Sequence, residues 1–317
     1  MQLRTPLCDL LGIEYPIIQG AMAWIAGGRL AAAVSEAGGL GVIGTGDGDR
    51  AWLEKEIDLA HQYTQKPFAV NLMLVSPHVE EIVDLVIKAE VPVVTTGGGN
   101  PGRYLERLKN AGIKVLPVVA SQALARRLSR LGADAIIAEG GESGGHVGEM
   151  TTMALVPMLV DAIEVPVVAA GGIADGRGLI AALALGAQGV QMGTRFICAQ
   201  ECNVHPRYQE RVIKAGDRDT VVCGLSTNHP VRVIHNHFTR EYLKQEFSGC
   251  NREELEKLGK GRYSRAAFDG DINEGSVLAG QICGLVKQVE PAATIVNEVI
   301  ADALRVRQQL EDIKCHV

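Results

Sequence analysis

The sequence predicts an α/β protein built as a (β/α)8 TIM barrel, and three observations support this fold. Up to about residue 197, short apolar runs alternate with helical stretches, and eight such runs occur at a spacing of roughly 25 residues. Aromatic residues form only 4% of the chain, whereas glycine accounts for 37 of its 317 residues. Buried parallel strands are rich in valine and isoleucine, and tight turns favour glycine, so this composition is typical of α/β architecture.

The expected strands are apolar runs, each followed by glycine, serine, asparagine or threonine. They are Tyr15–Gly20, Leu40–Gly44, Phe68–Leu74, Pro92–Thr96, Val115–Ala120, Ala135–Glu139, Pro166–Ala170 and Gly189–Phe196. The helices expected between them include Arg29–Ala37, Val79–Lys88, Pro101–Asn110, Gln122–Leu131, Met153–Ala162 and Arg177–Leu185. Glycines that follow several of these helices are C-cap candidates, and Asp175 is an N-cap candidate.

A doubly wound open sheet is the rival fold. That fold usually has five or six parallel strands and a glycine fingerprint after the first strand. Here the first turn reads Gln-Gly-Ala-Met-Ala-Trp, which is no such fingerprint. The segment Gly44–Gly48 resembles one, but it lacks the final glycine and follows the second strand. The barrel is therefore favoured.

The alternation of strands and helices stops after the eighth strand. The region that follows holds two charged amphipathic stretches, Pro206–Gly216 and Arg252–Lys260, and few strand-like runs. A final helix over Ala292–Lys314 has the length and apolar stripe of an eighth outer helix. Insertions in the loop after a barrel strand lie at the face that carries the active site. The expected division is a barrel over residues 1–203 and 286–317, with an inserted substrate or acyl-entrance region over 204–285.

Composition argues against several functional classes. The net charge of −6 is opposite to the basic footprint of a nucleic-acid-binding protein. The seven cysteines are odd in number and widely scattered, so we expect no disulfide framework. No apolar run approaches the roughly 20 residues that span a bilayer, and the first residues carry charges and prolines where a signal peptide would be apolar. We expect a cytoplasmic protein that binds neither membrane nor nucleic acid.

Two glycine turns follow the last two expected strands. One contains Gly171 and Gly172, and the other contains Gly193 and Thr194. In a barrel, these two loops and a helix N-terminus form the usual phosphate site. Glycine is needed there because phosphate oxygens approach bare backbone N–H groups. The alternative is that both turns only need glycine for their shape.

A second cluster, Glu139–Gly148, follows the sixth strand and contains His146 between glycines. A histidine on a loop at the catalytic face can accept a hydrogen bond when neutral and donate one when protonated. The alternative is a surface histidine in a flexible segment. Asn71, at the end of the third strand, is placed at the same mouth, although alone it is better explained by a structural role.

The cysteines and histidines in the last third of the chain are candidate ligands of a metal ion. Cys198, Cys202 and His205 are close in sequence, and His235 and His237 follow. Structural zinc usually uses two matching pairs of ligands, and no second pair fits here. We therefore expect buried thiols and surface histidines, and no metal.

Together these motifs resemble the flavin-dependent, barrel-type enoyl-acyl-carrier-protein reductases of bacterial fatty-acid synthesis, which are related to nitronate monooxygenases. Glycine-flanked histidine and paired glycine turns are common to that wider superfamily, and the first and last stretches resemble the reductases more. The stretches that carry the resemblance are Tyr15–Trp24, Lys66–Leu74, Val93–Gly97, Gly144–Gly148, Ala169–Asp175, Gln191–Phe196, Val231–Arg232, Phe238–Arg240 and Gly275–Gln281.

The resemblance implies FMN as cofactor and NADH or NADPH as hydride donor to a trans-2-enoyl thioester. His146 would hydrogen-bond the thioester carbonyl and stabilise the developing enolate. It also implies an acyl-carrier protein as partner, and allows a homodimer and an activating monovalent cation. The residues it places at FMN are Ala21, Met22, Asn71, Glu139, Gly145, Gly171, Gly172, Gln191, Gly193 and Thr194.

Three alternatives remain open from sequence. A nitronate monooxygenase would use the same flavin and histidine with oxygen, and a barrel could bind a phosphorylated ligand without redox chemistry. For the carrier, the basic stretch with Lys257, Lys260, Arg262 and Arg265 is either a docking loop or a solvated face that offsets nearby glutamates.

Overall fold

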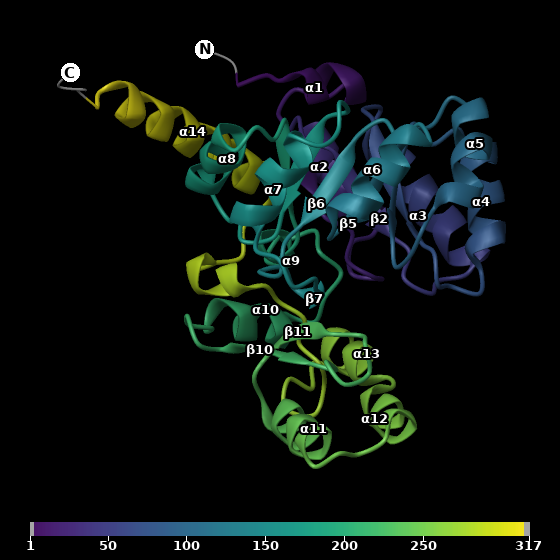
Figure 1. Ribbon diagram of the computed structural model, residues 1–317, viewed down its shortest axis with the longest axis vertical. Helices are drawn as coiled ribbons and strands as arrows, with labels where there is room; N and C mark the ends of the chain where they lie inside the picture. The colour runs from purple at the N-terminus through teal and green to yellow at the C-terminus, as the bar shows by residue number, and fades with distance from the viewer. Residues whose placement is uncertain (1–2, 314–317) are drawn as a thin grey trace.

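The computed structural model describes residues 3–313 and contains the predicted barrel (Figure 1). Its eight parallel strands follow the order β1-β9-β8-β6-β5-β4-β3-β2. A further parallel bridge between Ile18 and Leu40 joins the two edge strands and closes the sheet. The barrel strands are β1 (Ile17–Gln19), β2 (Gly41–Gly44), β3 (Phe68–Met73), β4 (Val93–Gly97), β5 (Lys114–Val119), β6 (Ile136–Glu139), β8 (Val167–Ala170) and β9 (Gly189–Met192).

Helices follow the strands and form the outer layer. The predicted final helix is α14, which packs against α8 and α2 and so completes the ring; its predicted end at Lys314 lies outside the described residues. The helices of the barrel are α1 (Pro6–Leu11), α2 (Gly28–Glu36), α3 (Arg50–Tyr63), α4 (Val79–Lys88), α5 (Gly102–Asn110), α6 (Gln122–Arg130), α7 (Thr152–Val160), α8 (Gly176–Ala184), α9 (Thr194–Ile197) and α14 (Ala292–Glu311).

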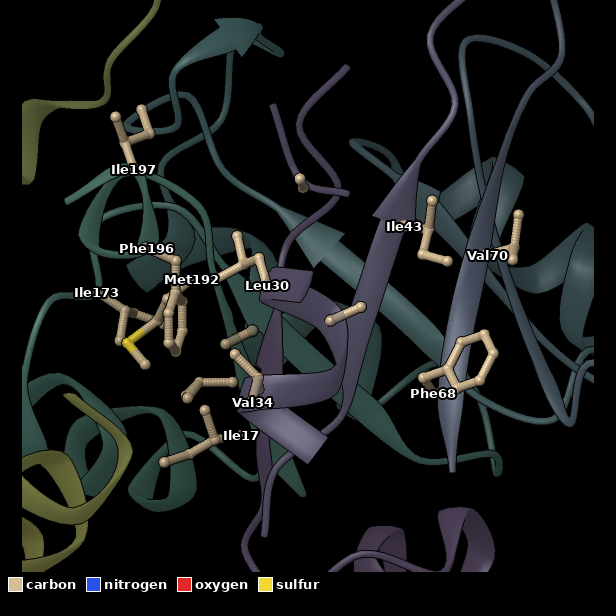
Figure 2. Packing of buried hydrophobic residues seen from close by; sticks show 14 of the residues in the cluster. Ile17, Leu30, Val34, Ile43, Phe68, Val70, Ile173, Met192, Phe196 and Ile197 are labelled. Carbon is tan, nitrogen blue, oxygen red and sulfur yellow. The ribbon is translucent and has the colours of Figure 1, made fainter. Parts of the chain in front are cut away.

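The strand alternation divides the core into two layers. Inward side chains such as Ile18, Ala69 and Ile137 fill the barrel interior, and α1 adds Leu7 and Cys8 to the same cluster. Outward side chains pack under the helices, and Figure 2 shows part of that layer, in which α2 lies against the strands. Several strands are shorter than predicted, and β9 differs most: it ends at Met192 because the next residues begin the helical turn α9.

The insert forms a lobe beside the mouth of the barrel, below it in Figure 1. As expected, the insert is poor in strands: β10 and β11 are short, and they form a small antiparallel sheet in the order β10-β11-β7 with β7 from the loop after β6. Within residues 3–313, no helix combines the length and apolar character needed to cross a membrane. The elements of the lobe are β7 (Gly145–His146), α10 (Pro206–Ile213), β10 (Thr220–Cys223), β11 (Val231–Ile234), α11 (His237–Phe247), α12 (Arg252–Gly259), α13 (Arg262–Ala267) and the 3-10 helix η1 (Gln281–Leu285).

Candidate active site

Polar side chains line the barrel interior where the strands end. Side chains alternate along a strand, and Ala69 and Ile137 belong to the interior cluster. Two residues further on, Asn71 and Glu139 therefore face the interior at the carboxyl edge of the sheet. Gln191 takes the same position on β9, because its neighbours belong to the outer layer. The structure thus brings three of the sequence-predicted residues to one mouth.

Asn71 is held firmly in place. Its side-chain Nδ2 donates to Oγ1 of Thr95 at 2.9 Å, and its backbone carbonyl accepts from Oγ1 of Thr45 at 2.8 Å. The residue is 7% exposed. These contacts give Asn71 a structural role in joining β2, β3 and β4, and they fix its amide at the mouth.

Glu139 is partly buried at the end of β6, and burial raises the pKa of its carboxyl to about 7. No neighbouring charge offsets this effect. A buried carboxylate without a cation is costly, so the group takes up a proton near neutral pH. Glu139 can therefore donate a hydrogen bond below about pH 7 and carries a negative charge above it.

Replacing Glu139 with glutamine should change how stability depends on pH. The folded-state pKa lies above the usual value of 4.5, so the folded protein binds more protons than the unfolded chain between pH 4.5 and 7. Wild-type stability therefore falls as pH rises through this window, and Glu139→Gln should not show that fall. With flavin removed, urea titrations should show the variant gaining at most about 3 kcal/mol on wild type between pH 4 and pH 8. A constant difference would show that the carboxyl titrates normally.

The turn after β9 offers a space of the kind that a phosphate needs. A Cβ placed on Gly193 would meet nothing within 4 Å. Within residues 3–313, the backbone hydrogen bonds of the turns leave the N–H groups of Gly172, Gly193 and Thr194 without a carbonyl acceptor. The hydroxyl of Thr194 accepts from the N–H of Gly280 at 2.9 Å, so its own proton is free to donate.

A second orphaned donor lies in the adjoining loop. The Ser143 side chain is buried, and its Oγ has no hydrogen-bond partner among residues 3–313. A Cβ on Gly171 would lie 3.2 Å from the Ser143 nitrogen, which places this loop against the turn after β8. Buried hydroxyls are normally satisfied, so the arrangement fits an anionic group that accepts from Ser143, Thr194 and bare backbone. The residues therefore fit the phosphate of FMN.

The two predicted glycine turns differ in their use of glycine. Gly171 and Gly172 adopt positive φ angles of 89° and 73°. A side chain on Gly171 would lie 2.8 Å from the Gly140 carbonyl oxygen, and one on Gly172 would touch Glu142. These glycines are required for the loop after β6 to close on the turn after β8. Of the three glycines in these two turns, only Gly193 leaves open space where a side chain would be. The N-terminus of α8 is already capped by the side chain of Asp175, as predicted.

The loop after β6 is an ordered structure, whereas the sequence left open a flexible segment. The Glu142 carboxylate accepts from the Thr152 backbone nitrogen at 2.9 and 3.0 Å and from its hydroxyl at 3.0 Å. Nε and Nη2 of Arg232 both donate to the Gly141 carbonyl, at 3.1 and 2.9 Å. Arg232 comes from the insert, so this contact ties the lobe to the barrel mouth.

His146 lies in a strand, whereas the sequence predicted a loop. It pairs with Val231 of β11, and the next residue, Val147, donates its N–H to the Pro230 carbonyl at 3.1 Å. The side chain remains exposed. Desolvation, and then the charge of His229, lower the pKa of His146 below 6.5. The imidazole is therefore neutral at pH 7, when one ring nitrogen donates and the other accepts.

The loop after β1 brings Ala21 and Met22 to the same mouth. Both are partly buried. A Cβ on Gly20 would lie 3.3 Å from Cγ of Gln191 and 3.5 Å from Cα of Gly193, so the ends of β1 and β9 are in contact. The predicted ring contacts and the predicted phosphate turn are thus neighbours.

An aromatic contact between this loop and the insert was missed by the sequence analysis. Trp24 has a positive φ of 61° and stacks on Tyr263 of α13, with ring centroids 5.6 Å apart. The Tyr263 hydroxyl donates to the Ala23 carbonyl at 3.0 Å. The insert therefore touches the mouth on two sides, at the loop after β1 and at the loop after β6.

The candidate metal ligands have other partners. Burial raises the pKa of Cys198 to about 12 and raises that of Cys202 further. The Cys202 thiol donates to the Ile25 carbonyl, and Nδ1 of His205 accepts from the Arg207 nitrogen. Across residues 3–313, no group of three or more potential ligands is arranged to hold a metal ion.

Comparison with known proteins decides the family. The family model described as "Nitronate monooxygenase" matches residues 4–84 and 77–302. The chain belongs to the nitronate monooxygenase family. A probable nitronate monooxygenase from Staphylococcus aureus is 34% identical, over 96% of this chain and 99% of the relative.

Two solved structures of similar proteins cover nearly the whole chain. FabK from Thermotoga maritima has a TM-score of 0.95 and 48% identity, over 98% of this chain and 99% of its own. Nitroalkane oxidase from Streptomyces ansochromogenes has a TM-score of 0.86 and 28% identity, over 96% and 99%. These matches confirm the predicted barrel. Membership in the nitronate monooxygenase family confirms the prediction that the protein is a flavin-dependent oxidoreductase.

Proposed function

We propose that the chain is an FMN-dependent enoyl-acyl-carrier-protein reductase, which reduces a trans-2-enoyl thioester to the saturated acyl thioester. The observation that carries this proposal is the match to FabK, the type II enoyl-acyl-carrier-protein reductase, at 48% identity over 98% of the chain. That match spans the insert that borders the site. Nitroalkane oxidase covers a similar length of the chain, but its sequence identity is lower, at 28%.

The cofactor would lie across the mouth of the barrel. Gly193, Thr194 and Ser143 would hold the phosphate with their free donors. The ring would lie over the ends of β1, β3, β6 and β9, near Asn71 and Gln191. When bound, FMN supplies hydride transfer from NADH or NADPH to the β-carbon of the substrate.

His146 would bind the thioester carbonyl. Because its lowered pKa keeps it neutral at pH 7, it would donate from one ring nitrogen without a formal charge. That hydrogen bond becomes stronger as negative charge develops on the carbonyl oxygen, so it stabilises the enolate more than the substrate. The pairing of β7 with β11 fixes the backbone of His146 and so pre-organises the donor.

The substrate would reach the site on an acyl-carrier protein, and the insert would form the entrance. The contacts of Trp24 with Tyr263 and of Arg232 with Gly141 hold the lobe on either side of the mouth. An acyl chain that enters between these contacts would meet the predicted ring position first. This placement supports the predicted division into a barrel and an acyl-entrance region.

Anaerobic stopped-flow measurement tests the proposed function. The purified protein should be yellow, and acid-released flavin should migrate as FMN. NADH or NADPH should bleach the flavin rapidly, and a crotonyl thioester should then restore its absorbance. Bleaching by alkyl nitronates but not by nicotinamides would instead establish a nitronate monooxygenase, and a colourless protein that binds no flavin would exclude both activities.

A further inference from the structure

One exposed face of α11 in the insert carries two cations and an aromatic ring. Arg240, Lys244 and Phe247 are spaced at i, i+4 and i+7, so they share one side of the helix. All three are exposed, and Phe247 is 81% exposed. The opposite side packs Phe238 and Tyr242 into the core of the insert. The face is therefore fixed in orientation, and we call Arg240, Lys244 and Phe247 the α11 face.

The cations of the α11 face have no partner of their own. Among residues 3–313, the structure contains no ion pair or side-chain hydrogen bond of Arg240 or Lys244. Glu241 is the neighbouring acid, but it lies about 100° around the helix from Arg240. Glu246, the next acid on α11, directs its carboxylate to the backbone nitrogens of Gly224 and Ser226 and not to Arg240 or Lys244.

The basic stretch predicted from sequence is a weaker docking candidate. Arg262 donates to the carbonyls of Leu258 and Glu274 and lies over the ring of Phe238. Arg265 forms an ion pair with Asp271. Both guanidinium groups thus stabilise the fold of the insert. The lysines of that stretch stay exposed, next to the glutamates of α12.

The C-terminal end of α11 is fastened to the turn that leads into β11, the strand that pairs with β7. The Glu246 carboxylate binds the Gly224 nitrogen at 3.1 Å and the Ser226 nitrogen at 2.8 Å, so α11 is fastened to the turn between β10 and β11. Leu225, on that turn, is 62% exposed and extends the apolar surface. The turn ends at His229, whose charge affects the pKa of His146. A partner bound at the α11 face would therefore lie to one side of the candidate active site and leave its entrance open.

We propose that the α11 face, with Leu225, docks the acidic surface of the acyl-carrier protein; this inference rests on the proposed function. A carrier presents its thioester on a long flexible arm, so its protein surface must bind next to the site rather than in it. Arg240 and Lys244 would attract carboxylates, and Phe247 and Leu225 would supply the apolar anchor of the contact. A small, partly charged contact of this kind suits a partner that must leave after each turnover.

The test compares two substrates that share the crotonyl group. Arg240→Glu/Lys244→Glu should raise KM for crotonyl-acyl-carrier protein about tenfold or more, and KM for crotonyl-CoA should change less than about twofold. Phe247→Ser should raise KM for the carrier-bound substrate alone. The matched control is Arg126→Glu/Arg127→Glu on α6, which makes the same change in net charge at exposed cations of the barrel.

The measurements test the docking surface separately from the proposed reductase activity. Reduction of crotonyl-CoA by wild type establishes the activity, and titration with the holo carrier, which has no acyl group, measures docking without turnover. Equal losses on both substrates, an equal rise in the α6 control, or unchanged carrier binding would overturn the docking surface. A change in oligomeric state on Phe247→Ser would also overturn it, since the face would then be an interface between copies of this chain. If wild type binds the carrier but does not reduce crotonyl-CoA, the proposed function fails, and the docking surface is then decided by whether Arg240→Glu/Lys244→Glu weakens carrier binding.

Discussion

The Gly193→Val protein should fold normally and be purified without flavin. A Cβ at this position meets no protein atom within 4 Å, and the backbone φ of −98° is one that valine adopts readily. The added methyl groups would therefore occupy the space beside the free N–H groups of Gly193 and Thr194. Loss of that space should reduce FMN binding to a level that does not survive gel filtration. Flavin absorbance per protein measures the effect, and circular dichroism measures the fold.

Gly216→Val is the matched control for this experiment. Its Cβ would also meet nothing within 4 Å, but Gly216 lies in the insert, where its nitrogen donates to Asp219. This variant should keep a full complement of flavin. Normal flavin content in Gly193→Val would move the phosphate to another site, and loss in both variants would mean that valine disturbs the protein in general.

The barrel was predictable because each element is encoded locally. The apolar runs and their glycine turns predict all eight strands. A buried parallel strand appears in the sequence as a continuous apolar run, so it can be recognised without knowing which strand it pairs with. The end of β9 was placed too late because Val190 and Phe196 are both apolar, although one lies in a strand and the other in a helical turn. The strand β7 could not be predicted, because two residues have no periodicity and pair only with a strand far along the chain.

The candidate site shows the same division. Gly193 and Thr194 were predicted from their place after the last strand, which the fold itself assigns to phosphate. Ser143 and Thr152 were not selected, since their role depends on how the loop after β6 folds back against β8. The stacking of Trp24 on Tyr263 joins residues from opposite ends of the chain, and the sequence holds no local signal for it. Contacts within an element could be predicted, whereas contacts between distant loops could not.

The effect expected from replacing His146 with alanine depends on the protonation state of its imidazole. Because desolvation and His229 keep the imidazole neutral at pH 7, its function in the proposed reaction is to donate a hydrogen bond to the thioester carbonyl. Its strand pairing with Val231 uses only the backbone, so alanine at this position should leave β7 and the barrel intact. The phosphate turn does not include His146, so FMN should remain bound.

His146→Ala should therefore lose enoyl reduction by about 100-fold or more, the usual effect of one catalytic hydrogen-bond donor. Anaerobic reduction of the flavin by NADH or NADPH should change far less, because that half-reaction involves no thioester. Stopped-flow measurement of both half-reactions separates the two effects. His229→Ala is the matched control: it should raise the pKa of His146 but leave the maximal rate near wild type, because the imidazole donates a hydrogen bond in either protonation state. Near-wild-type enoyl turnover in His146→Ala would exclude a catalytic role, and equal losses in both half-reactions would point to a misplaced flavin.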